Sequence, residues 1–172
     1  MAGYLSLAGQ LNWIFHFQVL CMRTFQTLSE LPALVGQDVA VSDWITITQE
    51  QINQFAQSTG DHQWIHVDVD RAKAGPFGAP IAHGFLTLSL LPIFFASAME
   101  IVESRMGVNY GLNKVRFMAP VPVGSRLRAR FRLLSCDSID NNGVQITWHA
   151  AVEREGADKP VCVAESIVRR YP

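Results

Sequence analysis

The sequence predicts an α+β fold in which an antiparallel β-sheet wraps around one hydrophobic helix. Two observations support this fold class. Residues 81–106 are apolar nearly all round, and the residues after Gly107 switch to a hydrophobic period of two. A helix that is apolar on every side is usually buried, and strict alternation is typical of strands with one covered face. The change of period therefore indicates a buried central helix followed by a sheet.

The elements before this helix follow from local signals. Residues 31–41 contain a proline turn and then a predicted strand. A capping-box pattern that starts at Thr48, followed by apolar residues at helical spacing, predicts a short amphipathic helix over 49–58. Gly60 is expected to end this helix, because glycine readily adopts the left-handed conformation of a helix C-cap. The segment 61–80 is rich in glycine and proline and is expected to be irregular.

The later elements follow from proline and from alternation. Pro92 should kink the long helix or break it into two pieces. Four strands are expected after Gly107, joined by short turns, and Asn141-Asn142-Gly143 marks one hairpin. In one of these strands, apolar residues alternate with Arg126, Arg128, Arg130 and Arg132. These arginines are most simply a solvated strand face, and the alternative is that one or more binds a phosphate.

The composition limits the classes of function. The chain has 172 residues, of which 49% are hydrophobic and 17% charged, as expected of one well-packed domain. Its formal net charge of −1 gives no reason to expect nucleic-acid binding. The three cysteines are widely spaced and form no CxxC pair, so neither a disulfide framework nor a structural zinc site is indicated. We therefore expect a reducing, cytoplasmic setting.

The first part of the chain differs from the rest. No charged side chain occurs before Arg23, but polar residues interrupt the apolar ones, so a membrane span is not expected. The start also lacks the basic residue of a signal peptide. We predict an N-terminal extension over residues 1–30, with Met22 as an alternative start, and a single domain over residues 31–172.

The segment STGDHQWIH at 58–66 carries the first candidate chemistry. On a helix, Asp61 and His66 would point about 140° apart, so only a bend after Gly60 could bring them to one cavity. A carboxylate beside an imidazole is a suitable acid/base pair near neutral pH. Trp64 and Ile65 are expected to form an apolar wall beside the pair.

The segment PIAHGFLTLS at 80–89 carries the second candidate for chemistry. At the start of a buried helix the backbone N–H groups at Gly84 and after it would have no partner within the helix. Such groups can hold an oxygen that gains negative charge, for example a thioester carbonyl. Gly84 has no side chain, so a substrate could approach its amide closely.

Together the two motifs, FAQSTGDHQWIH and FGAPIAHG, resemble the MaoC-like (R)-specific enoyl-CoA hydratases and dehydratases, in particular their nodulation protein N-like branch. The resemblance spans residues 31–172. It implies a hotdog fold and a homodimer with its active sites near the subunit interface. It implies water addition to a trans-2-enoyl-CoA to give an (R)-3-hydroxyacyl-CoA, with no cofactor and no metal.

Carried onto this sequence, the resemblance implies that Asp61 and His66 are catalytic and that the backbone N–H of Gly84 binds the thioester carbonyl. Gly60, Gln63 and His83 are expected to support them. Many members have Asn-Pro where this chain has Gln63-Trp64, and some place a serine in the central helix near the position of Pro92. Both departures bear on the shape of the pocket and the acyl chain length.

Several other interpretations are open at this point. Asp61 could merely cap a turn, and His66 and His83 could be structural. His62 and His66 have the HxxxH spacing of a metal site, but that geometry needs a regular helix, which Gly60 and the apolar residues argue against. At the level of function, the rivals are a hotdog acyl-CoA thioesterase and a non-catalytic subunit that binds acyl thioesters.

Overall fold

The computed structural model describes residues 22–172. In chain order the strands are β1 (Arg23–Phe25), β2 (Asp38–Val41), β3 (Ile45–Thr46), β4 (Met99–Ile101), β5 (Met106–Phe117), β6 (Arg126–Ile139), β7 (Gly143–Arg154) and β8 (Cys162–Tyr171). The α-helices are α1 (Gln49–Thr59), α2 (Trp64–Val67), α3 (Val69–Lys73), α4 (Gly84–Ser89) and α5 (Leu91–Ala98). Two short 3-10 helices, η1 (Leu28–Glu30) and η2 (Pro32–Leu34), precede β2.

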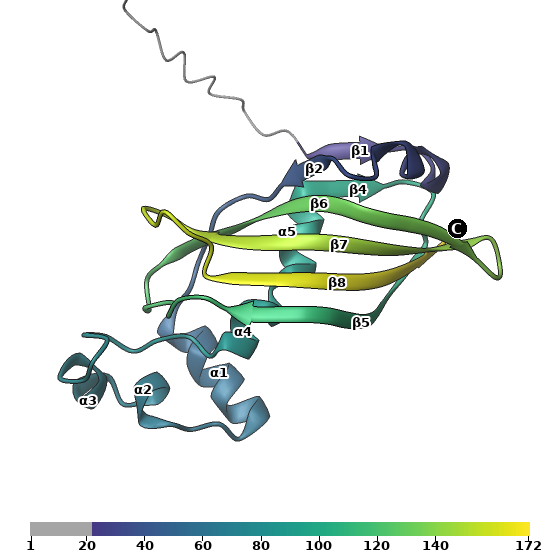
Figure 1. The fold of residues 1–172 in the computed structure, drawn as a ribbon. Coiled ribbons are helices and arrows are strands. Elements are labelled where there is room, and N and C mark those ends of the chain that lie inside the picture. Colours follow the sequence, from purple (N-terminus) through teal and green to yellow (C-terminus); the bar gives the residue numbers. More distant parts are fainter. Residues whose placement is uncertain (1–21) are drawn as a thin grey trace, which may run out of the picture.

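The main sheet wraps around the helices α4 and α5. Its strand order is β2-β6-β7-β8-β5, with β3 added through pairing to β6, and all these pairs are antiparallel. In Figure 1 the long strands run across the front of the molecule, α5 lies behind them, and α1 to α3 gather below one end. A sheet around a central helix is the hotdog arrangement, so the predicted α+β fold class is confirmed.

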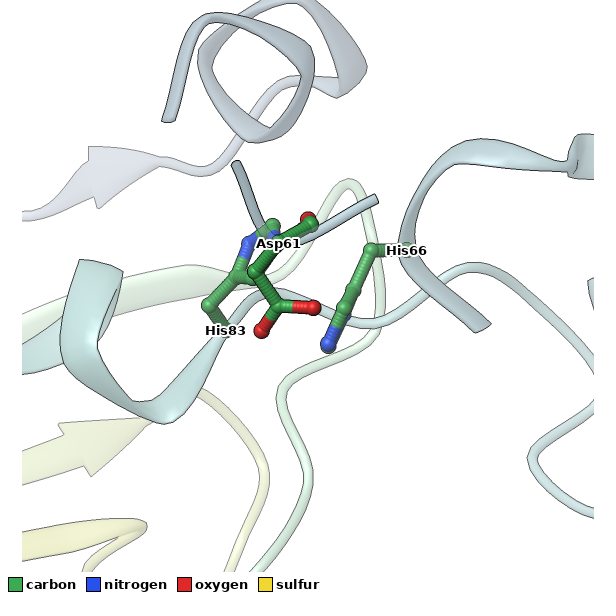
Figure 2. A group of neighbouring side chains, drawn as sticks. All are labelled: Asp61, His66 and His83. Atoms are coloured by element: carbon green, nitrogen blue, oxygen red, sulfur yellow. The ribbon is translucent and has the colours of Figure 1, made fainter. Parts of the chain in front are cut away.

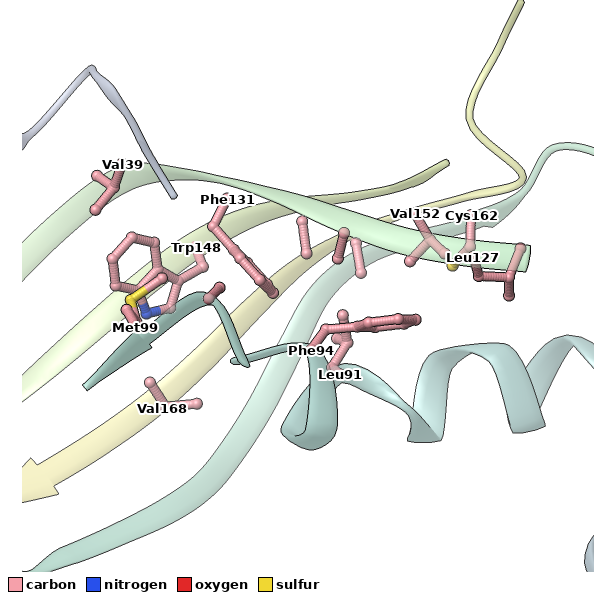
Figure 3. Packing of buried hydrophobic residues seen from close by; sticks show 14 of the residues in the cluster. Val39, Leu91, Phe94, Met99, Leu127, Phe131, Trp148, Val152, Cys162 and Val168 are labelled. Carbon is pink, nitrogen blue, oxygen red and sulfur yellow. The ribbon is translucent and has the colours of Figure 1, made fainter. Parts of the chain in front are cut away.

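The core lies between the inner face of the sheet and one side of α4 and α5. Figure 3 shows Leu91 and Phe94 of α5 facing the inward side chains of the strands. Phe94 and Phe131 are 0% exposed and Trp148 is 2% exposed. Phe95 stacks on Phe131 with ring centroids 4.0 Å apart. Aromatic pairs of this kind add to the free energy gained by burial, so the sheet holds the helices firmly in place.

The alternating strand and its hairpin have the predicted form. On β6 the apolar members of the pattern are each 0% exposed, namely Leu127, Ala129, Phe131 and Leu133. Arg128 and Arg130 project from the other face, where their Nε atoms donate to the carboxylate of Glu153 at 2.8 and 3.3 Å. Both arginines are thus paired with an acid, as expected of a solvated face. Asn141 and Asn142 have φ values of 61° and 56°, which suit the tight turn of a hairpin.

The central helix is shorter than predicted. It is broken at Leu90 into α4 and α5, as the proline at position 92 predicts. The expectation that helix continues to residue 106 is wrong, because Met99 has extended backbone angles and begins β4. Residues 99–101 pair in parallel with β1, and these hydrogen bonds compete with continuation of the helix.

Ordered structure begins before residue 31. Residues 23–25 pair with β4, and Phe25 and Leu28 are 3% and 4% exposed within the hydrophobic core. The folded domain therefore includes residues that we assigned to the extension. Residues 1–21 of that extension lie outside the described part of the chain. Within residues 22–172, no helix is long and apolar enough to cross a membrane.

The segment 61–80 is more ordered than its composition suggests. It contains the helices α2 and α3, which meet at Asp68. The Asp68 side chain accepts a hydrogen bond from the backbone N–H of Arg71 at 3.1 Å and so caps α3. A capping aspartate stabilises even a single helical turn, because it satisfies one of the first N–H groups.

Candidate active site

Helix α1 positions the first candidate residue through its two ends. Thr48 and Gln51 form the predicted capping box, with the Thr48 side chain accepting from the Gln51 N–H at 3.2 Å. At the other end Gly60 has a left-handed φ of 76°, and its N–H donates to the carbonyl of Ala56 at 2.8 Å. This conformation turns the chain sharply after the helix. Asp61 therefore lies directly after the bend that is needed to bring it near His66.

The bend brings three polar side chains together. Asp61, His66 and His83 each offer one oxygen or nitrogen atom, and these atoms all lie within 4.8 Å of one another. Figure 2 shows the Asp61 carboxylate next to the two rings. Asp61 is exposed, whereas His66 and His83 are only 6% and 3% exposed. The predicted pairing of Asp61 with His66 is thus present, with His83 as a third member.

His66 is held in one tautomer by the backbone. Its Nδ1 lies 2.7 Å from the carbonyl oxygen of Ile81, and because a carbonyl can only accept, Nδ1 carries the hydrogen. In the neutral ring Nε2 is then free to accept a proton. Burial lowers the pKa of His66 below its ordinary value, and His83 lowers it further. The Ile81 carbonyl and Asp61 raise this pKa, but burial outweighs them.

His83 links the two motifs. Its Nε2 donates to the backbone carbonyl of Asp61 at 2.9 Å, and its ring stacks on His66 with centroids 3.7 Å apart and an interplanar angle of 25°. On its other side the ring of Phe55 from α1 lies at 5.1 Å. These contacts place His83 between the two motifs, against the backbone of Asp61 and the ring of His66.

Gln63 supports the pair through its backbone. Its N–H donates to the Asp61 carboxylate at 3.4 Å, and its carbonyl accepts from the N–H of His66 at 2.9 Å. The Gln63 side chain is exposed. The backbone at this position thus bridges Asp61 and His66, whichever side chain it carries.

A cavity of about 360 Å³ opens beside His66. It is lined by His66, Phe77, Ile81, Ala82, Gly84, Thr87, Phe117, Met118, Ala119, Pro120, Val121 and Val161. The expected wall residues, Trp64 and Ile65, are not among them. The Trp64 ring instead lies under the guanidinium of Arg71, at 4.4 Å, and the Ile65 carbonyl accepts from the Ile81 N–H at 3.0 Å. The wall is apolar as predicted, but other residues form it.

Gly84 lies at the first position of α4, where its N–H has no acceptor within the helix. A Cβ built at this glycine would lie 2.9 Å from the ring of Phe117. The absence of a side chain is therefore needed for the close approach of Phe117. Gly84 also lines the cavity, so its backbone N–H is a candidate donor to a ligand there.

The sequence does not reveal Phe117 or Met118 as parts of the site, and it does not single out Phe77 or Thr87 within the motifs that contain them. Phe117 and Met118 lie at the end of a strand far along the chain, and no local pattern connects them to His66. Thr87 carries the clearest available signal, because it follows Gly84 by three residues and so lies on the same face of the helix.

The geometry of the three polar side chains does not suit a metal ion. A histidine binds a metal in the plane of its ring. The rings of His66 and His83 are stacked face to face, so their in-plane lone pairs do not converge on one point. Nδ1 of His66 and Nε2 of His83 are also occupied by carbonyl oxygens. The HxxxH spacing does not create a site either, since His62 is exposed and precedes α2.

Comparison with known proteins gives consistent matches. The model of the MaoC-like domain matches residues 30–155. 3-Hydroxyacyl-thioester dehydratase Z of Mycobacterium tuberculosis (strain ATCC 25618 / H37Rv) is 57% identical over 148 residues, which cover 86% of this chain and 98% of that protein. Nodulation protein N of Rhizobium leguminosarum bv. viciae is 46% identical over 143 residues, which cover 82% of this chain and 89% of that protein.

The solved structures agree on the fold. The unliganded R-hydratase PhaJ1 from Pseudomonas aeruginosa superposes with a TM-score of 0.62 and 25% sequence identity, over 80% of this chain and 81% of that chain. The family match covers most of the chain, and one relative is more than half identical over nearly its whole length. The chain therefore belongs to the MaoC-like dehydratase family.

Proposed function

We propose that this protein is an acyl-thioester hydro-lyase that interconverts trans-2-enoyl-CoA and (R)-3-hydroxyacyl-CoA. The observation that carries the proposal is the meeting of Asp61 and His66, from either side of a sharp bend, with His66 and Gly84 lining one largely apolar cavity. The names of the relatives, a 3-hydroxyacyl-thioester dehydratase and an R-hydratase, support the same reaction.

In this proposal the two side chains carry the proton transfers of the reaction. In hydration, Asp61 and the free Nε2 of His66 hold a water molecule, whose oxygen bonds to C3 of the enoyl group. One proton of that water passes to the pair, and a proton is delivered to C2, so that one water is added overall. Dehydration runs through the same positions in reverse. The lowered pKa of His66 keeps its ring neutral, and so able to accept the proton, at neutral pH.

Gly84 supplies the electrostatic part of the mechanism. When water adds to C3, negative charge develops on the thioester carbonyl oxygen. We place this oxygen at the backbone N–H of Gly84, which lies at the positive end of α4 and lines the cavity. Donors that are already in position stabilise such a charge without reorganisation during the reaction.

A second hollow could take the acyl tail. A cavity of about 330 Å³ lies between α5 and β5, and its lining includes Leu88, Leu91, Pro92 and Phe95. Pro92 and Phe95 also line a further cavity of about 590 Å³. Both hollows adjoin α5, and the apolar side chains of Leu88, Leu91 and Phe95 would cover an acyl chain there.

We further propose that the protein is a homodimer formed through β5. This strand is at the edge of the sheet and pairs with β8 alone among the described strands. It exposes a series of apolar side chains, namely Met106, Val108, Tyr110, Leu112 and Phe117. A long apolar edge strand readily pairs with another chain, and two copies of β5 can pair about a two-fold axis. Phe117 would carry this interface to the catalytic cavity.

The free thiols of Cys136 and Cys162 suit a reducing compartment, and we propose the cytoplasm as its location. Burial raises the pKa of the Cys162 thiol to about 11, so this group stays protonated and chemically inert at neutral pH.

The reaction is tested with crotonyl-CoA, whose conjugated double bond absorbs in the ultraviolet and loses that absorbance on hydration. Asp61→Asn and His66→Gln should each lower kcat/KM by roughly 10²–10⁴, because each removes a group that moves or holds the proton. The control is His62→Gln, which alters an exposed histidine beside the pair and should leave the rate unchanged.

The same samples separate the rival functions. A thioesterase would release free coenzyme A, which a thiol reagent detects, whereas a hydratase leaves the thioester intact. A binding subunit would bind the thioester without turnover. Near-wild-type rates in both Asp61→Asn and His66→Gln would show that the catalytic assignment is wrong.

A further inference from the structure

The hydroxyl of Thr87 is buried without a hydrogen-bond partner. Thr87 is 2% exposed, and its Oγ1 has no partner among the described residues. A threonine inside a helix usually directs its hydroxyl to the carbonyl four residues back. Here that carbonyl, of His83, accepts the backbone N–H of Thr87 at 3.2 Å, and the hydroxyl makes no such bond. A buried hydroxyl without a partner reduces stability, so its presence needs an explanation.

The location of the hydroxyl suggests what it binds. Among the twelve residues that line the catalytic cavity, only His66 and Thr87 have polar side chains. His66 already has its proposed role, so Thr87 supplies the one hydroxyl of an otherwise apolar chamber. A ligand oxygen in this chamber is therefore the candidate for the missing hydrogen-bond partner.

Thr87 and Gly84 are presented by the same helix. They are three residues apart in α4, so they lie on one face of it, and both line the cavity. Asp61, which follows α1, and His66, which lies in α2, belong to the other motif. An atom held between Gly84 and Thr87 therefore lies on the α4 side of the chamber, away from the proposed water.

We propose that the Thr87 hydroxyl donates a hydrogen bond to the thioester carbonyl oxygen of the substrate, as a second donor beside the Gly84 N–H. This inference rests on the proposed function. Apart from the sulfur, the carbonyl oxygen is the only hydrogen-bond acceptor among the first atoms of an enoyl chain. A carbonyl oxygen has two lone pairs, so one backbone N–H and one hydroxyl can satisfy it together.

The arrangement explains the unpaired hydroxyl. In the free protein Thr87 contributes nothing to stability, because its hydroxyl has been removed from water without compensation. In the complex the same hydroxyl meets an oxygen whose negative charge grows during the reaction. Its hydrogen bond is then strongest when the barrier is crossed, which is what accelerates the chemical step.

The test is Thr87→Val, which has nearly the same shape but no hydroxyl, with Thr87→Ser as the variant that restores it. For crotonyl-CoA we expect Thr87→Val to lower kcat/KM by on the order of 10²–10³, as the loss of one oxyanion donor does elsewhere, and Thr87→Ser to recover most of it. The Tm of Thr87→Val should be equal to or higher than that of wild type, because an unsatisfied buried group is removed. A purely structural hydroxyl would lower Tm instead.

Binding of butyryl-CoA, measured by calorimetry, checks which substrate oxygen is involved. This saturated thioester has the carbonyl but no 3-hydroxyl and cannot be hydrated. Its Kd should rise about 2- to 10-fold in Thr87→Val, the value of one neutral hydrogen bond. The control is Thr46→Val, the same change at an exposed position of β3, which should alter none of these quantities.

Each outcome is decisive. An unchanged kcat/KM in Thr87→Val, a rate loss that only follows a loss of folded protein, or an unchanged Kd for butyryl-CoA would overturn the inference. If the wild-type protein does not hydrate crotonyl-CoA, the proposed function fails, and the change in Kd for butyryl-CoA still decides whether Thr87 binds the carbonyl.

Discussion

At the scale of single residues, His66 is controlled by opposing contacts. Burial beside the cavity disfavours its charged form, whereas the Ile81 carbonyl and Asp61 favour it, and burial dominates. The ring is thus kept neutral with Nε2 free, which is the state that a base in the reaction needs. A neutral buried histidine also makes the fold sensitive to acid.

This sensitivity gives a prediction for stability. Because the pKa of His66 is lower in the folded protein than its unfolded value of 6.5, the unfolded chain binds more protons between those two values. The contribution of His66 to stability should be complete above pH 6.5 and should be lost as the pH falls through the lowered pKa. Thermal unfolding at several pH values, in wild type and His66→Gln, measures this loss as a difference between the two proteins.

In the same pH range kcat/KM should fall as His66 becomes protonated. Equal pH dependence of Tm in wild type and His66→Gln would contradict the assigned cause, since the acid sensitivity would then come from groups other than His66.

Residue types in the site were predictable, but their surroundings were not. Asp61, His66 and Gly84 follow from two motifs; in the structure Asp61 lies beside His66, and His66 and Gly84 line the same cavity. Trp64 was assigned to the cavity because it lies between Asp61 and His66 in the sequence. In the one-turn helix α2 its ring points elsewhere and packs on Arg71 and Gly75. Neighbours along a chain do not share a face unless the backbone conformation places them there.

At the scale of elements, the geometry of the site depends on the junction between α1 and α2. Gly60 joins them in the left-handed conformation, and a Cβ there would meet no atom within 4 Å. The only cost of a side chain at this position is therefore backbone strain. The residue that follows is Asp61, so strain here is transmitted directly to a catalytic group.

Gly60→Ala should lower the free energy of unfolding by about 1–2 kcal/mol, the cost of a left-handed alanine. It should also lower kcat/KM, because relaxation of the strain moves Asp61. The matched control is Gly156→Ala, at a turn between β7 and β8, where φ is 75° and a Cβ again meets nothing within 4 Å. Both variants should lose similar stability in urea unfolding, but only Gly60→Ala should lose activity. Equal activity in the two would show that the bend does not position Asp61.

The lengths of the elements show where local signals fail. The capping box at Thr48 and the glycine at position 60 define α1 almost to the residue. The sequence places the end of the central helix too late, because Met99, Glu100 and Ile101 carry no local signal that ends a helix. Their extended conformation is selected by pairing with β1, a partner more than 70 residues away in the chain.

At the scale of the whole molecule, the edge strand β5 connects assembly with catalysis. Its exposed apolar side chains run toward Phe117, which packs on Gly84 in the cavity. If two copies pair through β5, the interface reaches the edge of each active site. Assembly and activity should then depend on the same strand.

The prediction is that the protein sediments as a dimer and that Val108→Lys with Leu112→Lys shifts it to a monomer. Both side chains are exposed, at 42% and 46%, so the lysines cost little in a single chain but would be buried together in the dimer. Leu134→Lys, at a 37% exposed position of β6, is the control and should stay dimeric. Sedimentation equilibrium distinguishes the species, and a monomeric wild type would contradict the proposal.

The sequence by itself determines features that depend on residues close in the chain. These are the α+β class, the hairpin at Asn141, the helix α1 and the identities of the main catalytic candidates. Only the tertiary structure decides four other features. These are the residues of the cavity wall, the early end of α5, the place of residues 23–30 in the core and the proposed role of Thr87. These features arise where distant segments meet: β1 with β4, and Phe117 with Gly84. A sequence records which side chains are available, and packing across long separations decides which of them face the same space.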